Sequence, residues 1–213
     1  MIQIDDAGSG SLIGGTCIAA TRVETGEYVY DFIPVSYYQN NMFHSKLYLE
    51  KSYQIVFSLL KRLKWKPQEK MEICQGYMFD QVRIIFEAKK IPCFSTKIVY
   101  PLQPLIEKTF QDYALSLGLL PQYVMYTKYP LHFHRILRWV YADYNKRMKL
   151  CKTGWKSWKR YGNLPVNMEE DVLYKRNYTC LKCGKAIQTG SKVRRLEYHS
   201  NCPNIIFLHN KCI

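Results

Sequence analysis

The sequence predicts an α/β protein with a small cysteine-rich module at its C-terminal end. Apolar runs of strand length alternate with segments of helical period over roughly the first 150 residues, and four of the eight cysteines lie from Cys180 onwards. Of the 213 residues, 47% are hydrophobic and 15% aromatic, so the chain can bury a core and is not a disordered polypeptide.

The N-terminal part predicts three strands and then a helix. Apolar runs at 1–6, 12–20 and 28–35 are separated by short turns, which is typical of an antiparallel meander. The period changes over 43–63, where Leu47, Ile55, Leu59 and Leu63 can share one face of a helix that Pro67 closes.

Strands and helices then alternate. The pattern predicts a βββαβαβα order followed by a long helix, with strands at 71–74 and 93–100, helices at 78–89 and 105–117, a further strand at 123–127 and the long helix at 131–152. This order indicates a mixed sheet covered by helices.

Charge is concentrated near the C-terminal end. The net charge is +14, and residues 144–213 hold 15 basic and 4 acidic residues against 16 and 13 in residues 1–143. Such a basic segment predicts a polyanion partner, because Lys and Arg that neutralise phosphates release counterions. The alternative is a solvated basic surface that favours solubility.

No run approaches the roughly 18 to 20 apolar residues of a membrane span, and Asp5 and Asp6 interrupt the N-terminus before a signal peptide could form. The cysteines before Cys180 are scattered among apolar neighbours, as in a reduced protein. We therefore expect a cytoplasmic protein without membrane contact.

Residues 4–15, Ile4-Asp5-Asp6-Ala7-Gly8-Ser9-Gly10-Ser11-Leu12-Ile13-Gly14-Gly15, carry a family resemblance. The stretch resembles the opening of type 2 ribonucleases H, Asp-Glu-x-Gly-Arg-Gly-Pro-Leu-x-Gly-Pro, and more loosely the first strand of RuvC-type Holliday-junction resolvases. Asp6 stands where the type 2 family has Glu, and Ser9 where it has Arg. The resemblance implies a ribonuclease H-like mixed sheet over residues 1–153, and dimerisation as in resolvases stays open.

The same resemblance implies two divalent ions, Mg²⁺ or Mn²⁺, held by three or four carboxylates around the end of the first strand. Asp5 or Asp6 supplies the first, since alternation requires only one of them to face the site. Glu72 is expected to be the second, because an acid on a short apolar strand needs compensation. Its rivals are Asp80, which also suits a helix start, and Glu50, which also suits a solvated helix face.

A late helix supplies the last acid in this superfamily, and Asp143 is the candidate here. Its alternative role is an ion pair with Lys146 or Arg147 on the same helix. A histidine near this acid can act in proton transfer or product release, and we expect His132 rather than His134.

The C-terminal cysteines have the spacing of a zinc site. Cys180-x2-Cys183 and His209-x2-Cys212 supply three thiolates and an imidazole, the ligand set of a tetrahedral structural Zn²⁺. His199 and Cys202 have the same spacing and compete for the second pair. Residues 177–213 therefore predict a zinc module similar to zinc ribbons and treble-clef fingers, folded mainly by its ion.

Residues 154–176 are expected to be a basic linker. The segment from Lys146 to Arg160 contains seven Lys or Arg and no acid, and the candidates for nucleic-acid contact are Lys152, Trp155, Lys156, Trp158, Lys159 and Arg160. The tryptophans have the alternative role of docking the segment onto the main domain. Together these patterns predict a divalent-metal-dependent nuclease acting on structured DNA or RNA–DNA hybrid, or else a non-catalytic nucleic-acid-binding or scaffold protein of the same fold.

Overall fold

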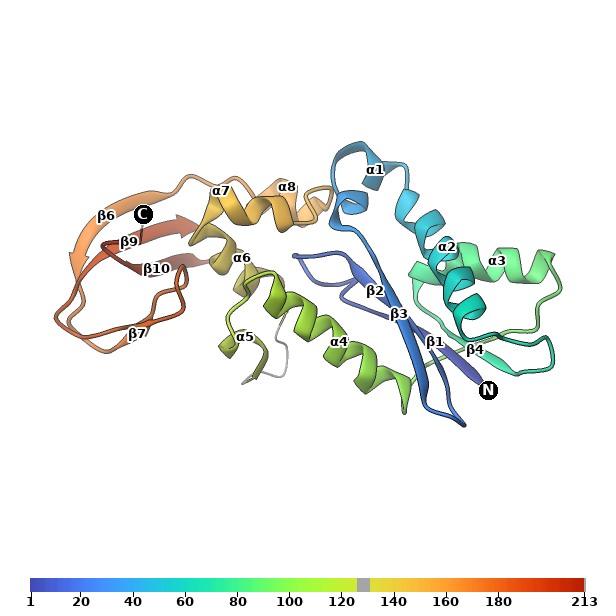
Figure 1. The fold of residues 1–213 in the computed structure, drawn as a ribbon. Helices are drawn as coiled ribbons and strands as arrows, with labels where there is room; N and C mark the ends of the chain where they lie inside the picture. Colours follow the sequence, from blue (N-terminus) through green and yellow to red (C-terminus); the bar gives the residue numbers. More distant parts are fainter. Residues whose placement is uncertain (126–130, 213) are drawn as a thin grey trace.

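The computed structural model describes residues 1–125 and 131–212 and has a mixed five-stranded sheet at its N-terminal end (Figure 1). The strand order is β3-β2-β1-β4-β5, with β1 antiparallel to β2 and parallel to β4. The strands are β1 (Ile2–Ala7), β2 (Thr16–Arg22), β3 (Glu27–Ile33), β4 (Met71–Cys74) and β5 (Phe94–Thr96).

The central strand β1 is buried on both faces. Ile2 and Ile4 pack into one apolar cluster, whereas Ala7 belongs to a second cluster on the other face. Because successive side chains alternate, Asp5 points to the face of Ala7 and Asp6 to the face of Ile4. The expected α/β class and the first three strands are therefore confirmed.

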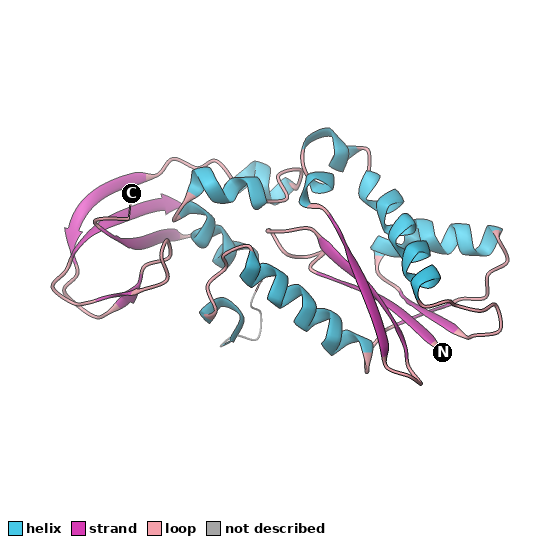
Figure 2. Cartoon of the chain, in the orientation of Figure 1, coloured by secondary structure: helices cyan, strands magenta, loops and turns pink. Residues whose placement is uncertain are grey.

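Helices cover both faces of this sheet (Figures 1 and 2). On the Ile4 face lie α2 (Leu47–Arg62) and α3 (Asp80–Ala88), with α1 (Asn40–His44) and the short 3-10 turns η1 (Val35–Tyr38) and η2 (Tyr77–Phe79). On the Ala7 face lies α4 (Leu102–Ser116), which buries Leu102, Ile106 and Phe110. Of the stripe that predicted α2, Ile55, Leu59 and Leu63 are buried, whereas Leu47 is exposed.

Two expected elements differ in the second half. Residues 123–125, the start of the strand expected at 123–127, belong to the short helix α5 (Gln122–Met125), and the rest of that expectation, 126–127, lies outside the described residues. The expected helix at 131–152 is divided into α6 (Phe133–Tyr141), α7 (Tyr144–Arg147) and η3 (Met148–Leu150). The division falls at Asp143, whose φ of −151° and ψ of 62° are not helical.

The C-terminal part contains a three-stranded antiparallel sheet of order β10-β9-β6 and a short hairpin. Its strands are β6 (Asn167–Val172), β7 (Tyr178–Thr179), β8 (Ala186–Ile187), β9 (Lys192–His199) and β10 (Pro203–His209). Residues 154–176, expected to be a linker, contain α8 (Lys156–Tyr161) and all of β6. The segment is therefore structured, and its strand completes the C-terminal sheet.

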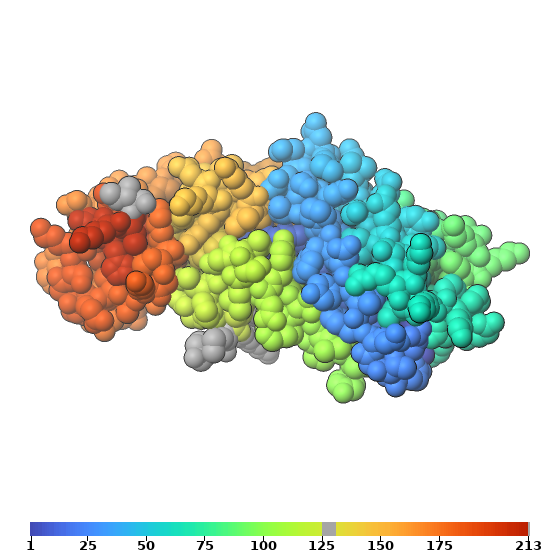
Figure 3. Space-filling view, viewed as in Figure 1, coloured from blue at the N-terminus to red at the C-terminus, as the bar shows by residue number. Residues whose placement is uncertain are grey.

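One apolar cluster joins the C-terminal sheet to the rest of the molecule. Leu12 and Ile13, from the loop after β1, share it with Trp139 of α6 and with Val193 and Leu208 of the C-terminal strands. The C-terminal part accordingly packs against α6 and α7 (Figure 3). In the part of the chain that the structure describes, no helix has both the length and the apolarity needed to cross a bilayer.

Candidate metal centre and carboxylate site

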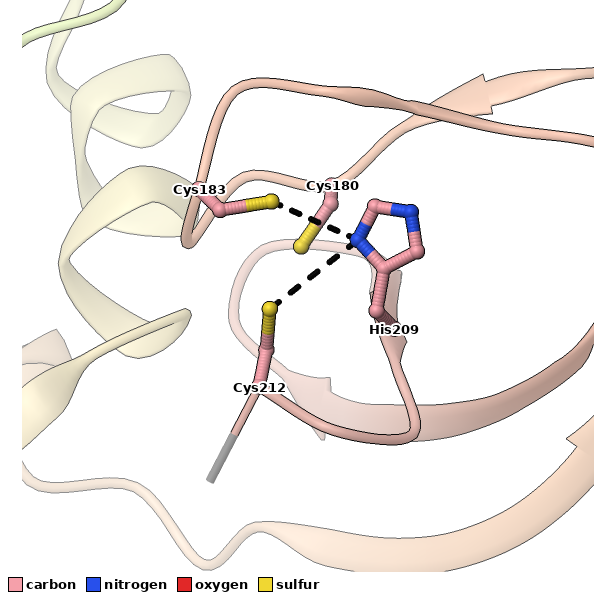
Figure 4. A group of neighbouring side chains, drawn as sticks. All are labelled: Cys180, Cys183, His209 and Cys212. Carbon is pink, nitrogen blue, oxygen red and sulfur yellow. Dashed lines mark hydrogen bonds between the residues drawn. The ribbon is translucent and has the colours of Figure 1, made fainter.

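The two predicted knuckles meet at one point of the C-terminal part. Ligand atoms of Cys180, Cys183, His209 and Cys212 all lie within 4.8 Å of one another (Figure 4). His209 Nδ1 is 3.3 Å from Cys183 Sγ and 3.9 Å from Cys212 Sγ. Three thiols and one imidazole gathered in this way can hold a metal such as zinc.

Local backbone geometry brings the first two cysteines together. The Gly184 N–H donates to the Cys180 carbonyl at 2.8 Å, and the Cys180 N–H donates to the Lys185 carbonyl at 2.9 Å. Gly184 closes this turn with a φ of +77°, which favours glycine. Burial opposes ionisation of Cys180, but hydrogen bonds from the backbone of Cys183, His209 and Lys182 outweigh it and lower the pKa of the thiol to about 7.

His209 is oriented for ligation through its Nδ1 atom. Its Nε2 lies 3.1 Å from the Ala186 carbonyl, a partner that fixes the proton on Nε2 and leaves the Nδ1 lone pair facing the sulfurs. The competing pair, His199 and Cys202, is exposed at the hairpin between β9 and β10 and is outside the cluster. The cluster that could hold a metal therefore contains His209 and Cys212, and not His199 or Cys202.

Sequence reasoning missed the residue that holds the knuckle in place. The buried Arg147 donates to the Leu181 and Lys182 carbonyls at 2.9 and 3.0 Å, and to the Trp139 carbonyl at 2.6 Å. Its guanidinium thus ties the turn between Cys180 and Cys183 to α6. In the sequence Arg147 is one of several charges in a basic run, and nothing there indicates that its side chain is buried.

A second group of ligand-capable side chains lies at the C-terminal ends of β1 and β4. Asp5, Asp6 and Cys74 each place a ligand atom within 4.8 Å of the others. The Asp6 N–H donates to Asp5 Oδ1 at 2.8 Å, and the chain then turns at Gly8, whose φ is +82°. A Cβ at Gly8 would lie 2.0 Å from the Phe110 ring, so this turn requires glycine.

Desolvation dominates the electrostatics of the two carboxyls. Asp5 is 7% exposed, and burial raises its pKa above the usual value. Burial likewise raises the pKa of Asp6 to about 6, with a further contribution from the neighbouring Asp5. A hydrogen bond from Ser9 and the nearby charge of Lys152 partly offset the burial of Asp6. Among the described residues neither carboxylate forms an ion pair within 4.0 Å, so a bound cation would add to this compensation.

Lys152 lies beside this pair and is fully buried, contrary to its expected role as a phosphate contact. Its Nζ donates to the carbonyls of Gly8 and Ser9 at 2.6 and 3.3 Å and lies over the Tyr38 ring at 4.5 Å. A side chain enclosed in this way cannot reach a phosphate. It instead holds the turn that follows Asp6.

Burial lowers the pKa of Lys152 to about 7 although Asp6 favours its charged form. The folded protein then binds fewer protons than the unfolded chain between pH 7 and the ordinary lysine pKa, so the free energy of unfolding should rise across that window. We expect this rise to be up to about 4 kcal/mol in the wild-type protein and to be absent from Lys152→Met. Denaturant unfolding at pH 7 and pH 10 measures the effect, and Lys156→Met, which replaces an exposed lysine, is the control. If the free energy of unfolding changed equally with pH in the wild type and in both variants, the burial of the Lys152 charge would be contradicted.

The other predicted acids are engaged elsewhere. Glu72 lies on β4 but accepts hydrogen bonds from Lys70 Nζ at 3.1 Å and Gln3 Nε2 at 3.3 Å, nearer the start of β1. Asp143 pairs with Lys182 Nζ at 3.2 Å, close to the cysteine cluster rather than with Asp5 and Asp6. Neither belongs to the ligand group at the strand ends.

Three further candidates have structural roles or exposed positions. Asp80 pairs with Arg83 at the start of α3, and Glu50 is exposed on α2, where it accepts from Gln54. His132 is exposed at the start of α6, and its ring centroid is 6.1 Å from that of His134. The structure gives none of them a contact with the Asp5 and Asp6 pair.

The basic helix α8 follows Lys152, whose ammonium bonds to the turn after Asp6. Lys156, Lys159 and Arg160 are exposed on it. Trp158 stacks on Tyr144 with 6.4 Å between ring centroids, and Trp155 lies 5.2 Å from Lys152 Nζ. These contacts agree with the alternative role of the tryptophans, which is to dock this segment onto the rest of the protein. The three cations of α8 face solvent.

Comparisons with known proteins do not assign the chain to a family. A scan against protein-family models finds no match, and a search of curated protein sequences finds none either. We therefore infer the function from the two ligand clusters and the charges around them.

Proposed function

We propose that the chain is a divalent-metal-dependent nuclease of ribonuclease H-like fold. The observation that carries the proposal is the pair of desolvated carboxyls, Asp5 and Asp6, that end the central strand of a mixed sheet without an ion-pair partner among the described residues. The β3-β2-β1-β4-β5 order, with three antiparallel strands followed by parallel ones, supports the resemblance that residues 4–15 carry.

The residues at the strand ends suit a cation. Asp5 and Asp6 supply oxygen donors, and desolvation raises the pKa of both, so a positive ion between them would favour their ionised forms. A divalent ion at this place would polarise a phosphodiester and activate water for its hydrolysis. Lys152 holds the Gly8 and Ser9 carbonyls and so fixes the turn that presents Asp6.

The exposed cations of α8 suit the phosphate backbone of structured DNA or an RNA–DNA hybrid. The Lys152 Nζ bond to the Gly8 carbonyl and the Gly154 N–H bond to the Tyr38 carbonyl fix the start of α8 near the end of β1. A strand held along α8 would therefore pass close to Asp5 and Asp6. The metal cluster at Cys180 would stabilise the C-terminal sheet rather than take part in hydrolysis.

Replacing Lys156, Lys159 and Arg160 together by Gln should weaken nucleic-acid binding and its dependence on salt. Each phosphate contact removed lowers the slope of log affinity against log salt by about 0.9, so we expect the slope to fall by about 2 to 3. Fluorescence anisotropy at several salt concentrations measures it.

The matched control replaces Lys61, Lys64 and Lys66, which are exposed near the end of α2. The Ile2 N–H donates to the Lys70 carbonyl, so that region adjoins the start of β1, away from the carboxylate site. An equal loss of slope in both triple variants would mean that charge alone, and not the position of α8, governs binding.

A second candidate is a non-catalytic nucleic-acid-binding or scaffold protein of the same fold. The observation that favours it is the absence of Glu72 and Asp143 from the ligand group, which leaves two carboxyls where the ribonuclease H-like resemblance implies three or four. The two candidates differ in one measurement: a nuclease cleaves when a divalent cation is added, whereas a binding module retains only the salt-dependent affinity.

A further inference from the structure

Cys74 occupies the place at the strand ends where an additional carboxylate was expected. It is the last residue of β4, which runs parallel to β1, so the two strands end at the same edge of the sheet. Its Sγ lies within 4.8 Å of ligand oxygens of both Asp5 and Asp6. Glu72, two residues earlier on the same strand, is bound to Lys70 and Gln3 instead.

The thiol lies beside a buried carboxylate. Cys74 hydrogen-bonds through its side chain to Asp5, which is 7% exposed and is in no ion pair among the described residues. A carboxylate buried in this way is unfavourable unless a positive charge or several hydrogen bonds compensate it. The two aspartates and the thiol therefore form a donor set that a cation would stabilise.

The turn after β4 lies against two of the donors. An added Cβ at Gly76 would lie 3.6 Å from Asp6 Oδ1 and 3.7 Å from Cys74 Sγ, in van der Waals contact with both. Burial and the two aspartates raise the pKa of Cys74 to about 11, and the Gly76 N–H, which donates to Cys74 Sγ at 3.4 Å, opposes this shift. A bound cation would favour the thiolate in the same way. Arg83 holds both ends of the turn through the Cys74 and Gly76 carbonyls, at 2.8 and 3.3 Å.

We propose that Cys74 is a metal ligand and that the site with Asp5 and Asp6 selects a borderline transition-metal ion, such as Co²⁺, Fe²⁺ or Zn²⁺, over Mg²⁺. Carboxylates alone suit Mg²⁺ and Mn²⁺, whereas a thiolate adds affinity for softer ions. Binding would release the thiol proton to solvent and form one metal–sulfur bond. This inference rests on the proposed metal site at Asp5 and Asp6 but names a different ion from the one that the resemblance implies.

The test adds Co²⁺ to full-length protein already loaded with one equivalent of zinc. Zinc binds more tightly than Co²⁺ to a thiolate-rich site, so it should keep the Cys180 cluster and leave Co²⁺ to the strand ends. We expect one equivalent of Co²⁺ to produce a sulfur-to-cobalt charge-transfer band in the near ultraviolet. Cys74→Ser should abolish that band and weaken Co²⁺ binding at least about 10-fold, with Mg²⁺ binding little changed.

Cys93→Ser is the matched control, because Cys93 is a half-buried thiol outside the ligand group. Cobalt-edge X-ray absorption of the wild-type protein needs no variant and should show one Co–S distance of about 2.3 Å, close to that of zinc thiolates.

The outcomes separate this inference from the proposed function. In one outcome Asp5→Asn removes Co²⁺ binding, Cys74→Ser leaves it unchanged, and X-ray absorption shows no Co–S distance. That outcome would overturn the role of Cys74 and leave the carboxylate site in place. No binding of Co²⁺, Mn²⁺ or Mg²⁺ to the zinc-loaded wild-type protein would overturn both.

Discussion

Asp5→Asn is expected to lower metal-dependent phosphodiester cleavage at least about 100-fold while leaving metal-free nucleic-acid affinity close to that of the wild type. The amide keeps the volume of the carboxyl but removes the charge that would hold a cation. Affinity comes instead from the exposed cations of α8, which the substitution does not touch. Cleavage of a labelled duplex and anisotropy in metal-free buffer measure the two effects separately.

The same substitution should leave stability without added divalent cation unchanged or higher. Burial raises the folded-state pKa of Asp5 above its unfolded value, so ionisation of this group opposes folding as pH rises through the folded pKa. The gain in stability should be smaller for Asp6→Asn, because Asp6 also favours the charged form of the buried Lys152. Thermal unfolding of zinc-loaded protein at pH 7 measures both.

Glu50→Gln and Glu72→Gln are the controls for this prediction. Both remove an acid, but Glu50 is exposed on α2, and Glu72 is bound to Lys70 and Gln3 outside the ligand group. We expect both to retain cleavage. Loss of cleavage in Glu72→Gln equal to that in Asp5→Asn would show that the catalytic set is the wider one that the resemblance implies.

Cys180→Ser is expected to release the bound metal and unfold the C-terminal sheet. Elemental analysis of the wild-type protein should find about one Zn²⁺ per chain at this structural site. Apparent binding energies of structural zinc sites are about 10 to 16 kcal/mol, more than so small a sheet can gain from its own core. The variant should therefore lose protection from hydrogen exchange over β6, β9 and β10.

The loss should extend into α6 and α7 but not into the N-terminal sheet. Trp139 of α6 shares an apolar cluster with the C-terminal strands, and Arg147 of α7 holds the carbonyls of Leu181 and Lys182. The cluster of Ile2, Ile4 and α2 is separate from it. Cys202→Ser, which removes an exposed thiol outside the metal cluster, should retain the metal; a metal-free wild-type protein with an intact C-terminal sheet would contradict the account.

The parts of the fold that sequence predicts are those with local signals. Apolar runs and turns predict β1 to β3, an apolar stripe predicts α2, and the spacing of Cys180, Cys183, His209 and Cys212 predicts the metal cluster. The choice against His199 and Cys202 required the structure, because both pairs have the same spacing. Strand pairing places only His209 and Cys212 beside the first knuckle.

The features of the fold and of the site that the sequence does not predict depend on contacts between residues distant in the chain. The chain bends at Asp143, because that residue pairs with Lys182 and the following turn buries Arg147 against the knuckle. Lys152 is buried because its ammonium finds the Gly8 and Ser9 carbonyls more than 140 residues earlier. Cys74 is different, because its position at the end of the strand next to β1 could have indicated a ligand near Asp5 and Asp6.

An anomalous-scattering map of crystals of the zinc-loaded protein soaked in Mn²⁺ tests most directly whether Asp5 and Asp6 bind a divalent cation. We expect a manganese peak bonded to carboxylate oxygens of both Asp5 and Asp6, at about 2.0 to 2.3 Å, and a separate zinc peak among Cys180, Cys183, His209 and Cys212. Occupied zinc with no manganese peak at Asp5 and Asp6, even at saturating Mn²⁺, would contradict the nuclease and leave the nucleic-acid-binding module as the function.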